Sequence, residues 1–540
     1  MFCYQCEETM NFKGCTKNGM CGKKGEVSDL QDDLIYLLKS IAFYNQKARE
    51  SGISEESTDE FMFDALFSTI TNTEFRASGI QERISRGFQI QNEIRQKLLD
   101  NGALDENNLP EIATLTPENL KDRNTGVLAT EDADIRSLRA LIIYSLKGIA
   151  AYAYHAMMLG NHNKKIVNFI EKALVATTDD SLTVKDLMSW ALKCGEHGFD
   201  VMADLDKANT GAFGNPEPTH VNIGTRSNPG ILVSGHDLKD LKELLDQTEG
   251  TGIDVYTHGE MLPAHAYPEF KKYDNLAGNY GGAWWEQRKE FESFNGPILL
   301  TSNCIVPPKD TYIDRLYTTG SVGYEGATHI VAEDGKKDFS AIIEQAKACE
   351  PPVQIEEGTV LTGYAYNHVL SNADKIVDAI QSGKIKRLMV MAGCDGRHKD
   401  RQYYTDFAEA LPKDTIILTA GCAKYRFNKL DLGDIDGIPR LWDAGQCNDS
   451  FSLVIIAQGL MARLGFIDVN EAPFSYNIAW YEQKAVLVLM TLLRLGVNNI
   501  TLGPKLFPFV TPNVYNELMK EKYGMVPSTT VEEDMERLLK

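Results

Sequence analysis

The sequence predicts an α-helical N-terminal domain followed by two α/β domains, each with a parallel sheet. Three observations support this fold class. Apolar residues recur with the period of a helix up to about residue 220. From about residue 230, short apolar runs alternate with helix-like segments. A chain of 540 residues is also too long for a single hydrophobic core, so several domains are expected.

The region up to about residue 220 is predicted to be a helical bundle. The segment Ser28–Gln31 has the pattern of a capping box, in which a Ser hydroxyl and a Gln amide bind free N–H groups at a helix start. An apolar helical face follows, formed by Leu30, Leu34, Leu37, Leu38, Ile41 and Ala42. Similar periodicity recurs over 59–72, 78–100, 132–159, 164–176 and 182–197. The polar stretch 101–131 is expected to be a long connection.

The rest of the chain is predicted to form the two α/β domains. Short apolar runs occur at 230–235, 253–257, 297–302, 329–332, 387–393, 415–421, 438–445, 477–481 and 499–503. Apolar strands separated by helices are typical of parallel sheets with both faces covered. The pattern begins near the Pro-, Gly- and Asn-rich stretch Gly214–Gly230. We therefore expect domains over residues 1–220, 221–375 and 376–540.

Composition restricts the classes of partner. The formal net charge is −21, and so acidic a surface repels nucleic-acid phosphates and anionic lipids. No apolar run reaches membrane-spanning length, because even 141–159 is interrupted by Lys147 and His155. The first residues lack the features of a signal peptide. We therefore expect a cytoplasmic protein, in which ten cysteines indicate metal or redox chemistry rather than disulfides.

Four cysteines lie within the first 21 residues: Cys3, Cys6, Cys15 and Cys21. Thiolates are soft ligands that suit iron–sulfur clusters or zinc. The segment has few bulky apolar residues, so metal–ligand bonds are expected to supply the free energy that orders it. Structural zinc sites usually pair two C-x2-4-C units, whereas five residues separate the second pair here. The spacing favours an iron–sulfur cluster, with structural zinc as the alternative.

Four more cysteines share one local position, just after the end of a predicted strand. They are Cys304, Cys394, Cys422 and Cys447. The carboxyl ends of parallel strands meet at one edge of a sheet, where α/β proteins gather ligands. A single buried cysteine is an ordinary core residue, but four at this position indicate a shared site. Cys194 and Cys349 lie within or at the end of predicted helices and are expected to be structural.

Non-sulfur ligand candidates occupy the same topological position. His236 and Glu482 each follow a predicted strand, and His258 and Glu260 both follow the run 253–257. A single residue of this kind is usually a helix cap or a solvated loop residue. Together with the four cysteines, they indicate a site with nitrogen, oxygen and sulfur donors. Cubane clusters usually bind cysteines alone, so we expect iron that also binds nitrogen and oxygen and accepts a substrate.

Longer motifs extend this pattern over essentially the whole chain. They are MFCYQCEET at the start, SGHDL at 234–238, YTHGEMLPAH at 256–265, TSNCIVPP at 301–308, GCDGRH at 393–398, GCAKYRF at 421–427, GQCND at 445–449 and WYEQKAV at 480–486. The set resembles the hybrid cluster protein family, also called prismane proteins or hydroxylamine reductases. This resemblance implies a helical N-terminal domain and two Rossmann-like domains related to carbon monoxide dehydrogenase, in agreement with the division above.

The resemblance also implies two metal cofactors. Matched residue by residue, a [4Fe-4S] cubane is implied at Cys3, Cys6, Cys15 and Cys21. A hybrid [4Fe-2O-2S] iron–sulfur–oxygen cluster is implied at His236, Glu260, Cys304, Cys394, Cys422, Cys447 and Glu482. In the family, the cysteine of the GCDG motif carries a persulfide, which implies the same for Cys394.

The activity that the resemblance implies is reduction of hydroxylamine to ammonia and water, with Cys394, Glu482 and Lys484 as catalytic residues. Lys484 would donate protons, with His398 as a weaker candidate, although a solvated surface lysine is equally compatible with the sequence. Nitric oxide reduction in nitrosative-stress defence and protein S-nitrosylation remain alternatives. Hard carboxylate ligands argue against carbon monoxide chemistry. No GxGxxG fingerprint follows a predicted strand, so a separate electron-donor protein is implied, and we expect a monomer.

Overall fold

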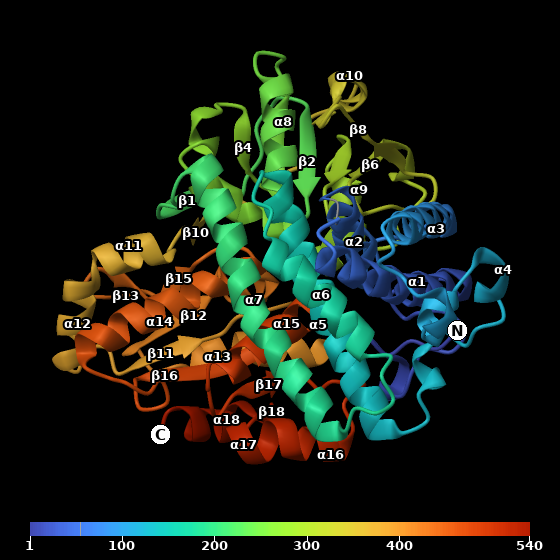
Figure 1. Cartoon of the computed structure of the whole chain (residues 1–540). Coiled ribbons are helices and arrows are strands. Elements are labelled where there is room, and N and C mark those ends of the chain that lie inside the picture. The colour runs from blue at the N-terminus through green and yellow to red at the C-terminus, as the bar shows by residue number, and fades with distance from the viewer. Residues whose placement is uncertain (54–55) are drawn as a thin grey trace.

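The computed structural model describes residues 1–53 and 56–540, and its N-terminal region is helical as predicted (Figure 1). The long helices are α1 (Gly25–Glu50), α2 (Glu56–Ser68), α3 (Ala77–Asp100), α5 (Ala133–Met158), α6 (Lys164–Ala176) and α7 (Val184–Phe213). The connection 101–131 contains short helical turns, among them α4 (Pro117–Leu120). Within the described ranges, no helix has the length and apolar character needed to cross a membrane.

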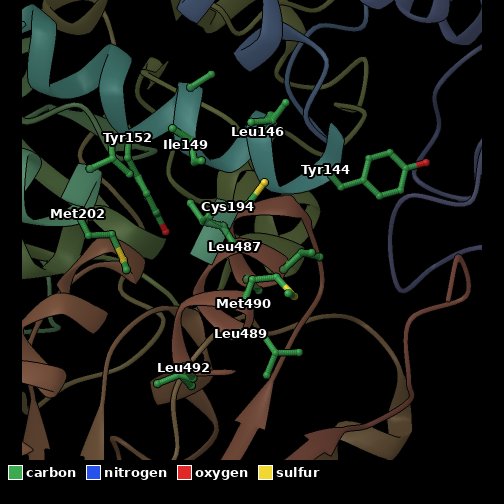
Figure 2. Close-up of a cluster of buried hydrophobic side chains, with 14 of the residues drawn as sticks. Tyr144, Leu146, Ile149, Tyr152, Cys194, Met202, Leu487, Leu489, Met490 and Leu492 are labelled. Carbon is green, nitrogen blue, oxygen red and sulfur yellow. The ribbon is translucent and has the colours of Figure 1, made fainter. Parts of the chain in front are cut away.

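A buried core joins this helical region to the C-terminal part of the chain. Helices α5 and α7 pack on each other and on α15 (Gln483–Arg494). Figure 2 shows Leu146 and Ile149 of α5 in the same cluster as Leu487 and Met490 of α15, and all four side chains are fully buried. Gly195 of α7 permits the close approach, because a Cβ there would lie 2.1 Å from the carbonyl oxygen of Met490. Each such apolar side chain contributes about 1.5–3 kcal/mol on burial, so the position of α15 is fixed by the core.

The first sheet contains six parallel strands in the order β4-β3-β2-β5-β6-β7. Their bounds are β2 (Gly230–Ser234), β3 (Asp254–His258), β4 (Leu276–Asn279), β5 (Ile298–Leu300), β6 (Leu316–Thr319) and β7 (Thr328–Ile330). The helices between them are α8 (Leu238–Thr248) and α9 (Gln287–Ser293), and α10 (Ser340–Lys347) follows β7. Ser234 lies beside both His258 and Leu300 in the register, so β2, β3 and β5 end at the same level.

The second sheet is also six-stranded and parallel, in the order β15-β12-β11-β16-β17-β18. Its strands are β11 (Arg387–Val390), β12 (Thr415–Thr419), β15 (Leu441–Asp443), β16 (Phe474–Ala479), β17 (Thr501–Gly503) and β18 (Val526–Pro527). The associated helices are α11 (Tyr366–Ser371), α12 (Ala373–Gln381), α13 (Gln402–Ala410), α14 (Ser450–Leu464), α15, α16 (Pro512–Val514), α17 (Glu521–Tyr523) and α18 (Val531–Leu538).

Three two-stranded pairings complete the fold. The strands β1 (Thr219–Asn222) and β10 (Thr359–Thr362) pair antiparallel, one before and one after the first sheet in the chain. Two hairpins are formed by β8 (Ala332–Glu333) with β9 (Lys336–Lys337) and by β13 (Asp434–Ile435) with β14 (Ile438–Pro439). The domain boundaries near residues 220 and 375 stay predictions.

The predicted strands are confirmed, whereas several local details are wrong. Strands β4, β6 and β18 went unpredicted because LAGN, LYTT and VP lack a sustained apolar run. The capping box was also wrong, since α1 begins at Gly25 and its N-cap residue makes no side-chain cap. Ser28 and Gln31 are instead buried within α1, where Gln31 accepts a hydrogen bond from Lys23. The pattern that resembled a helix start therefore lies inside the helix, about one turn after its first residue.

Candidate metal sites in the N-terminal loop and at the sheet edges

The four N-terminal cysteines lie in one folded loop. The backbones of Cys3 and Cys15 form an antiparallel bridge with N–O distances of 3.0 and 2.8 Å. The carbonyl of Cys6 accepts a hydrogen bond from the Thr9 hydroxyl at 2.7 Å. All four thiols are free, and all except Cys3 are buried. Burial, followed by the neighbouring thiols of Cys21 and Cys3, raises the pKa of Cys6.

A buried lysine accompanies these thiols. Lys23 is 6% exposed, and its ammonium donates to Gln31 Oε1 at 2.7 Å and lies 3.7 Å from Cys3 Sγ. A cation beside thiols favours their deprotonated form, which is the form that binds metal. A soft, all-sulfur donor set beside a buried cation fits an iron–sulfur cluster.

The second group of candidate ligands is carried by loops that follow seven parallel strands. In the first sheet, His236 follows β2, Glu260 follows β3 and Cys304 follows β5. In the second sheet, Cys394 follows β11, Cys422 follows β12, Cys447 follows β15 and Glu482 follows β16. Three of these strands belong to the first sheet and four to the second. The position of each side chain is therefore determined by a buried strand directly before it.

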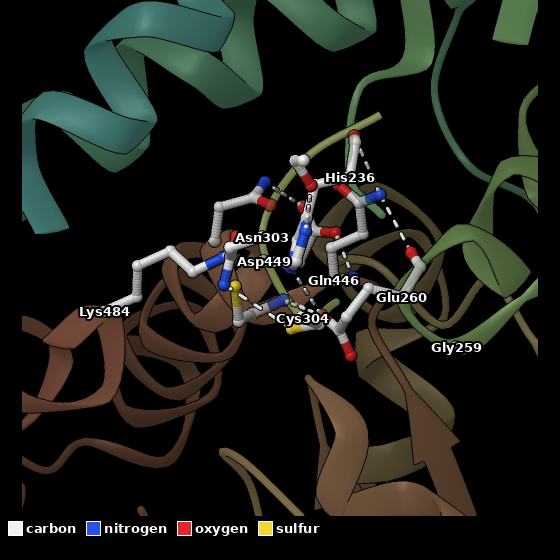
Figure 3. Close-up of polar contacts among 12 residues, drawn as sticks. His236, Gly259, Glu260, Asn303, Cys304, Gln446, Asp449 and Lys484 are labelled. Carbon is white, nitrogen blue, oxygen red and sulfur yellow. Dashed lines mark hydrogen bonds and ion pairs between the residues drawn. The ribbon is translucent and has the colours of Figure 1, made fainter. Parts of the chain in front are cut away.

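Residues from both sheets meet at this place (Figure 3). Donor atoms of His236, Glu260 and Cys447 all lie within 4.8 Å of one another. His236 Nε2 is 3.7 Å from Glu260 Oε2, and the Cys447 backbone amide donates to the same carboxylate oxygen at 2.8 Å. A nitrogen, an oxygen and a sulfur donor are therefore available to one centre.

Electrostatic coupling links the remaining candidates to this centre. Burial, followed by the charges of Glu260 and Cys304, raises the pKa of Cys422. Burial and then Glu482 raise the pKa of Cys394. The pKa of Glu482 is itself raised by burial, despite the opposing effect of a nearby lysine. Cys304, Cys394 and Cys422 also pack in one cluster, beside the three donor atoms of His236, Glu260 and Cys447 that lie within 4.8 Å of one another.

Two polar side chains orient the first-sheet residues. Ser302 Oγ lies 2.7 Å from His236 Nδ1, which leaves Nε2 directed at the centre. The Gln446 amide donates to the carbonyl oxygens of His236 at 3.1 Å and of Glu260 at 2.9 Å. Such contacts commonly fix the tautomer and orientation of metal ligands.

Lys484 lies inside the site rather than on the surface. The residue is 2% exposed. The ammonium donates to Asn303 Oδ1 at 2.8 Å, lies 3.0 Å from His236 Nε2 and is 3.8 Å from Glu482 Oε1. Burial alone would lower the pKa of Lys484, but the charges of Cys447 and Glu482 raise it overall. Burial and then Lys484 lower the pKa of His236, so the imidazole is neutral and able to bind metal.

The donor set includes a buried carboxylate. Oε1 of Glu260 is buried without a hydrogen-bond partner in the described part of the chain. Burial raises the pKa of Glu260, as it does for the four thiols around it. A buried polar atom without a partner is costly, and the mixture of nitrogen, oxygen and sulfur donors would fit an iron centre.

Backbone geometry at two positions is also unusual. Cys304 has φ of 84°, and its amide donates to the Asn72 carbonyl at 2.9 Å. A non-glycine residue in this region costs about 1–3 kcal/mol, and such outliers cluster at functional sites. Gly393 has φ of 113°, and a Cβ there would lie 1.9 Å from the carbonyl oxygen of Ala479. Only glycine allows the close approach that sets Cys394 at the sheet edge.

Two other histidines lie apart from the centre. His258 is held by Glu290 Oε2 at 2.9 Å and by Ser234 Oγ at 3.1 Å. His398 precedes the turn Lys399–Arg401, and no hydrogen bond or ion pair joins it to the seven ligands among the described residues. Cys194 is fully buried in the core of Figure 2, as expected of a structural residue.

Sequence reasoning missed several residues that contact the candidate ligands. Tyr152 of α5 donates to Cys447 Sγ at 3.3 Å, and no local pattern predicts this contact. Ser302, Asn303 and Gln446 each lie within two residues of a candidate cysteine. Their polar character beside the end of an apolar strand was the available signal.

The loop and the sheet-edge site are directly connected. Arg401 is fully buried, binds Glu7 Oε2 at 2.5 Å and donates to the Cys394 carbonyl at 2.9 Å. Gln483 of α15 donates to the Gln5 carbonyl at 2.5 Å. Residues beside the N-terminal cysteines therefore contact residues beside the second group of ligands.

An apolar cavity of about 610 Å³ reaches Cys394 and Cys447 from within the second sheet domain. Its lining includes Val390, Leu453, Ile478, Val488 and Leu492. The lining also includes Ile467, which is 98% exposed. The cavity therefore extends from the surface to the candidate ligands.

Comparison with known proteins agrees with this arrangement. A model of the Prismane/CO dehydrogenase family matches residues 1–536. A hydroxylamine reductase of Methanosarcina mazei is 61% identical over 540 residues and covers all of both chains. One from Caldanaerobacter subterraneus subsp. tengcongensis is 59% identical, covering 100% of this chain and 99% of that one.

Solved structures show the same fold at low identity. A carbon monoxide dehydrogenase from Thermococcus sp. AM4 aligns with a TM-score of 0.56 at 15% identity, covering 100% of this chain and 90% of that one. Carbon monoxide dehydrogenase IV from Carboxydothermus hydrogenoformans gives 0.56 at 14% identity, with 99% and 92% coverage. The chain belongs to the Prismane/CO dehydrogenase family.

Proposed function

We propose that the protein reduces hydroxylamine to ammonia and water, according to NH2OH + 2 e⁻ + 2 H⁺ → NH3 + H2O. The observation that carries this proposal is that donor atoms of three chemical kinds, from His236, Glu260 and Cys447, lie within 4.8 Å of one another at the ends of strands from both sheets, with the Lys484 ammonium 3.0 Å from His236 Nε2. Curated relatives at 61% and 59% identity are named hydroxylamine reductase.

We propose two cofactors. A [4Fe-4S] cubane would be held by Cys3, Cys6, Cys15 and Cys21, and a hybrid [4Fe-2O-2S] cluster by His236, Glu260, Cys304, Cys394, Cys422, Cys447 and Glu482. The resemblance to hybrid cluster proteins at the GCDG motif implies a persulfide on Cys394. When bound, such a cluster supplies electrons and an iron position that accepts a substrate atom.

Side chains near the second cluster would then donate protons and orient the ligands. Lys484 holds a proton within the site, and Asn303 together with Glu482 fixes its ammonium. Proton delivery by a positioned group accelerates a reaction about 10²–10⁴-fold. Ser302 and Gln446 hold His236 in the orientation required of a ligand. Burial of the site limits access by water and strengthens these polar interactions.

Nitric oxide reduction is the second candidate. The apolar cavity that reaches Cys394 and Cys447 would favour small uncharged molecules over ions. Hydroxylamine and nitric oxide both meet that condition, so the cavity supports either substrate.

We also propose a monomer in the cytoplasm that receives electrons from a separate donor protein. The absence of a dinucleotide-binding fingerprint after any predicted strand supports a separate donor. The acidic composition supports the exclusion of nucleic-acid and membrane partners.

The test is turnover by anaerobically purified, iron-loaded protein with a small-molecule reductant. We expect one ammonium ion per hydroxylamine consumed, at a rate well above that with nitric oxide. Ammonium formation no faster than in the Cys394→Ala variant would contradict hydroxylamine reduction, and faster nitric oxide consumption would favour the second candidate.

A further inference from the structure

The exposed part of the N-terminal loop is basic, although the whole chain has a net charge of −21. Lys13, Lys17 and Lys24 are exposed, and their side chains make no hydrogen bond or ion pair within the described residues. The two acidic residues of the loop, Glu7 and Glu8, are 1% and 6% exposed, and each pairs with an arginine. The loop therefore presents positive charge to the solvent, whereas its own carboxylates are buried.

The same loop also carries exposed apolar side chains. Met10 is 39% exposed and Met20 is 51% exposed, which makes them two of the few large apolar residues on the described surface. The ring of Phe12 is covered by a further cation, Lys505, at 5.1 Å from the ring centroid. An apolar centre with a charged rim is the usual composition of a protein–protein contact.

These exposed residues lie close to the N-terminal cysteines in the sequence. Exposed Met20 and Gly22 flank Cys21, and exposed Lys17 lies two residues from Cys15. Cys3 is itself partly exposed. Because electron transfer slows steeply with distance, a redox group held here would be reached most easily through these residues.

We propose that the surface formed by Met10, Lys13, Lys17, Met20 and Lys24 binds an acidic, one-electron carrier protein. This inference rests on the proposed function, which requires an external electron donor. Opposite charges steer the encounter of electron-transfer partners, whose contacts are small and short-lived. The positive charge of this loop would guide an acidic carrier toward it, although the whole chain is acidic.

The acidic surroundings limit the extent of this surface. Glu26 is exposed in the first turn of α1. Asp29, one turn later, is paired with the N-terminal ammonium at 3.1 Å. The basic surface therefore ends where α1 begins.

The electron balance is simple. Each reduced carrier would lose one electron to the group held by the N-terminal cysteines and leave oxidised. Two such encounters supply the two electrons that one hydroxylamine requires, and the two protons come from solvent. Contacts from Gln5 to Gln483 and from Glu7 to Arg401 connect the loop to the second site.

The test compares two charge-reversed variants of the iron-loaded protein. Lys13→Glu with Lys17→Glu alters the proposed surface. Lys375→Glu with Lys413→Glu makes the same change in charge at exposed residues of α12 and of the loop before β12. Helix α12 and the N-terminus lie on opposite sides of the molecule (Figure 1). The probe is an oxidised acidic bacterial ferredoxin, and the dissociation constant is measured at several salt concentrations.

We expect binding to the Lys13/Lys17 variant to be weakened about tenfold or more at low salt, with little change in the control pair. Lys13→Gln with Lys17→Gln should give an intermediate loss. Reduction of the protein by reduced ferredoxin, followed by the absorbance of its iron–sulfur groups, should slow in the same order. Equal losses in both charge-reversed variants, or none in either, would overturn the proposal.

These readouts are independent of hydroxylamine. A wild-type protein that binds and accepts electrons from ferredoxin but forms no ammonium would overturn the proposed function alone. Normal turnover with a small-molecule reductant, together with unaltered ferredoxin binding by the Lys13/Lys17 variant, would overturn the docking surface alone.

Discussion

The N-terminal loop and the sheet-edge site hold their candidate ligands by different physical means. The loop relies on a backbone bridge between Cys3 and Cys15 and on short turns. The sheet-edge ligands follow strands such as β2 and β12, in which every residue is buried. A ligand after a buried strand is held by the core whether or not metal is present. A ligand in a loop with little core depends on the metal for its order.

Cys394→Ala should produce the largest effect on activity. Loss of one sulfur donor from the sheet edge should reduce hydroxylamine turnover to background, while the fold and the N-terminal cubane remain. Turnover with a small-molecule reductant is measured together with EPR spectra and iron content. Activity equal to that of Cys349→Ala would mean that the strand-end cysteines do not form a shared site.

Glu482→Gln should remove most, but not all, of the activity. The amide has nearly the same shape but lacks the negative charge that stabilises an electron-poor iron, so the spectrum of the second cluster should change. The side chain also accepts from the Lys484 backbone amide at 2.8 Å, a contact that an amide oxygen retains. An unchanged spectrum at full activity would exclude Glu482 from the ligands.

Cys15→Ser tests whether the N-terminal loop, unlike the sheet-edge site, depends on metal for its order. We expect loss of the N-terminal cubane and faster proteolysis within residues 1–24, because the metal orders this segment. Turnover with a small-molecule reductant should largely persist, whereas turnover driven by a protein donor should fail. Wild-type iron content and wild-type resistance to protease would show that Cys15 does not hold the cluster.

Cys349→Ala should have the smallest effect. Cys349 follows α10, and its thiol donates to the Gln345 carbonyl at 3.3 Å. Removing one small, partly buried side chain should cost about 1 kcal/mol of unfolding free energy and leave turnover unchanged. Thermal unfolding and turnover are the measurements, and a large loss of activity would reveal a role that its place in the fold does not predict.

Much of the site was predictable because one rule applied repeatedly. An apolar run marks a buried parallel strand, and the residue just beyond it lies at the sheet edge, as Cys422 does after β12. The rule locates a side chain at the end of its own strand, but it does not specify which distant helices or strands will pack beside it. Tyr152, which contacts Cys447 from α5, could not be found in this way because only tertiary packing brings it there.

The burial of Lys484 was likewise beyond local inference. A lysine after a strand is usually solvated, and only the surrounding Asn303, His236 and Glu482 identify it as part of the site. Similarly, Ser28 and Gln31 match a capping box in sequence, yet they lie within α1. In both cases contacts from remote segments determine the environment.

We propose that strand ends from two sheets form a metal site distinct from the N-terminal loop. The most direct test is anomalous X-ray scattering at the iron edge, from crystals of anaerobically purified protein. We expect two separate groups of iron, one among Cys3, Cys6, Cys15 and Cys21 and one bounded by His236, Glu260 and Cys447. Iron in the loop alone, with none among the strand-end residues, would contradict it.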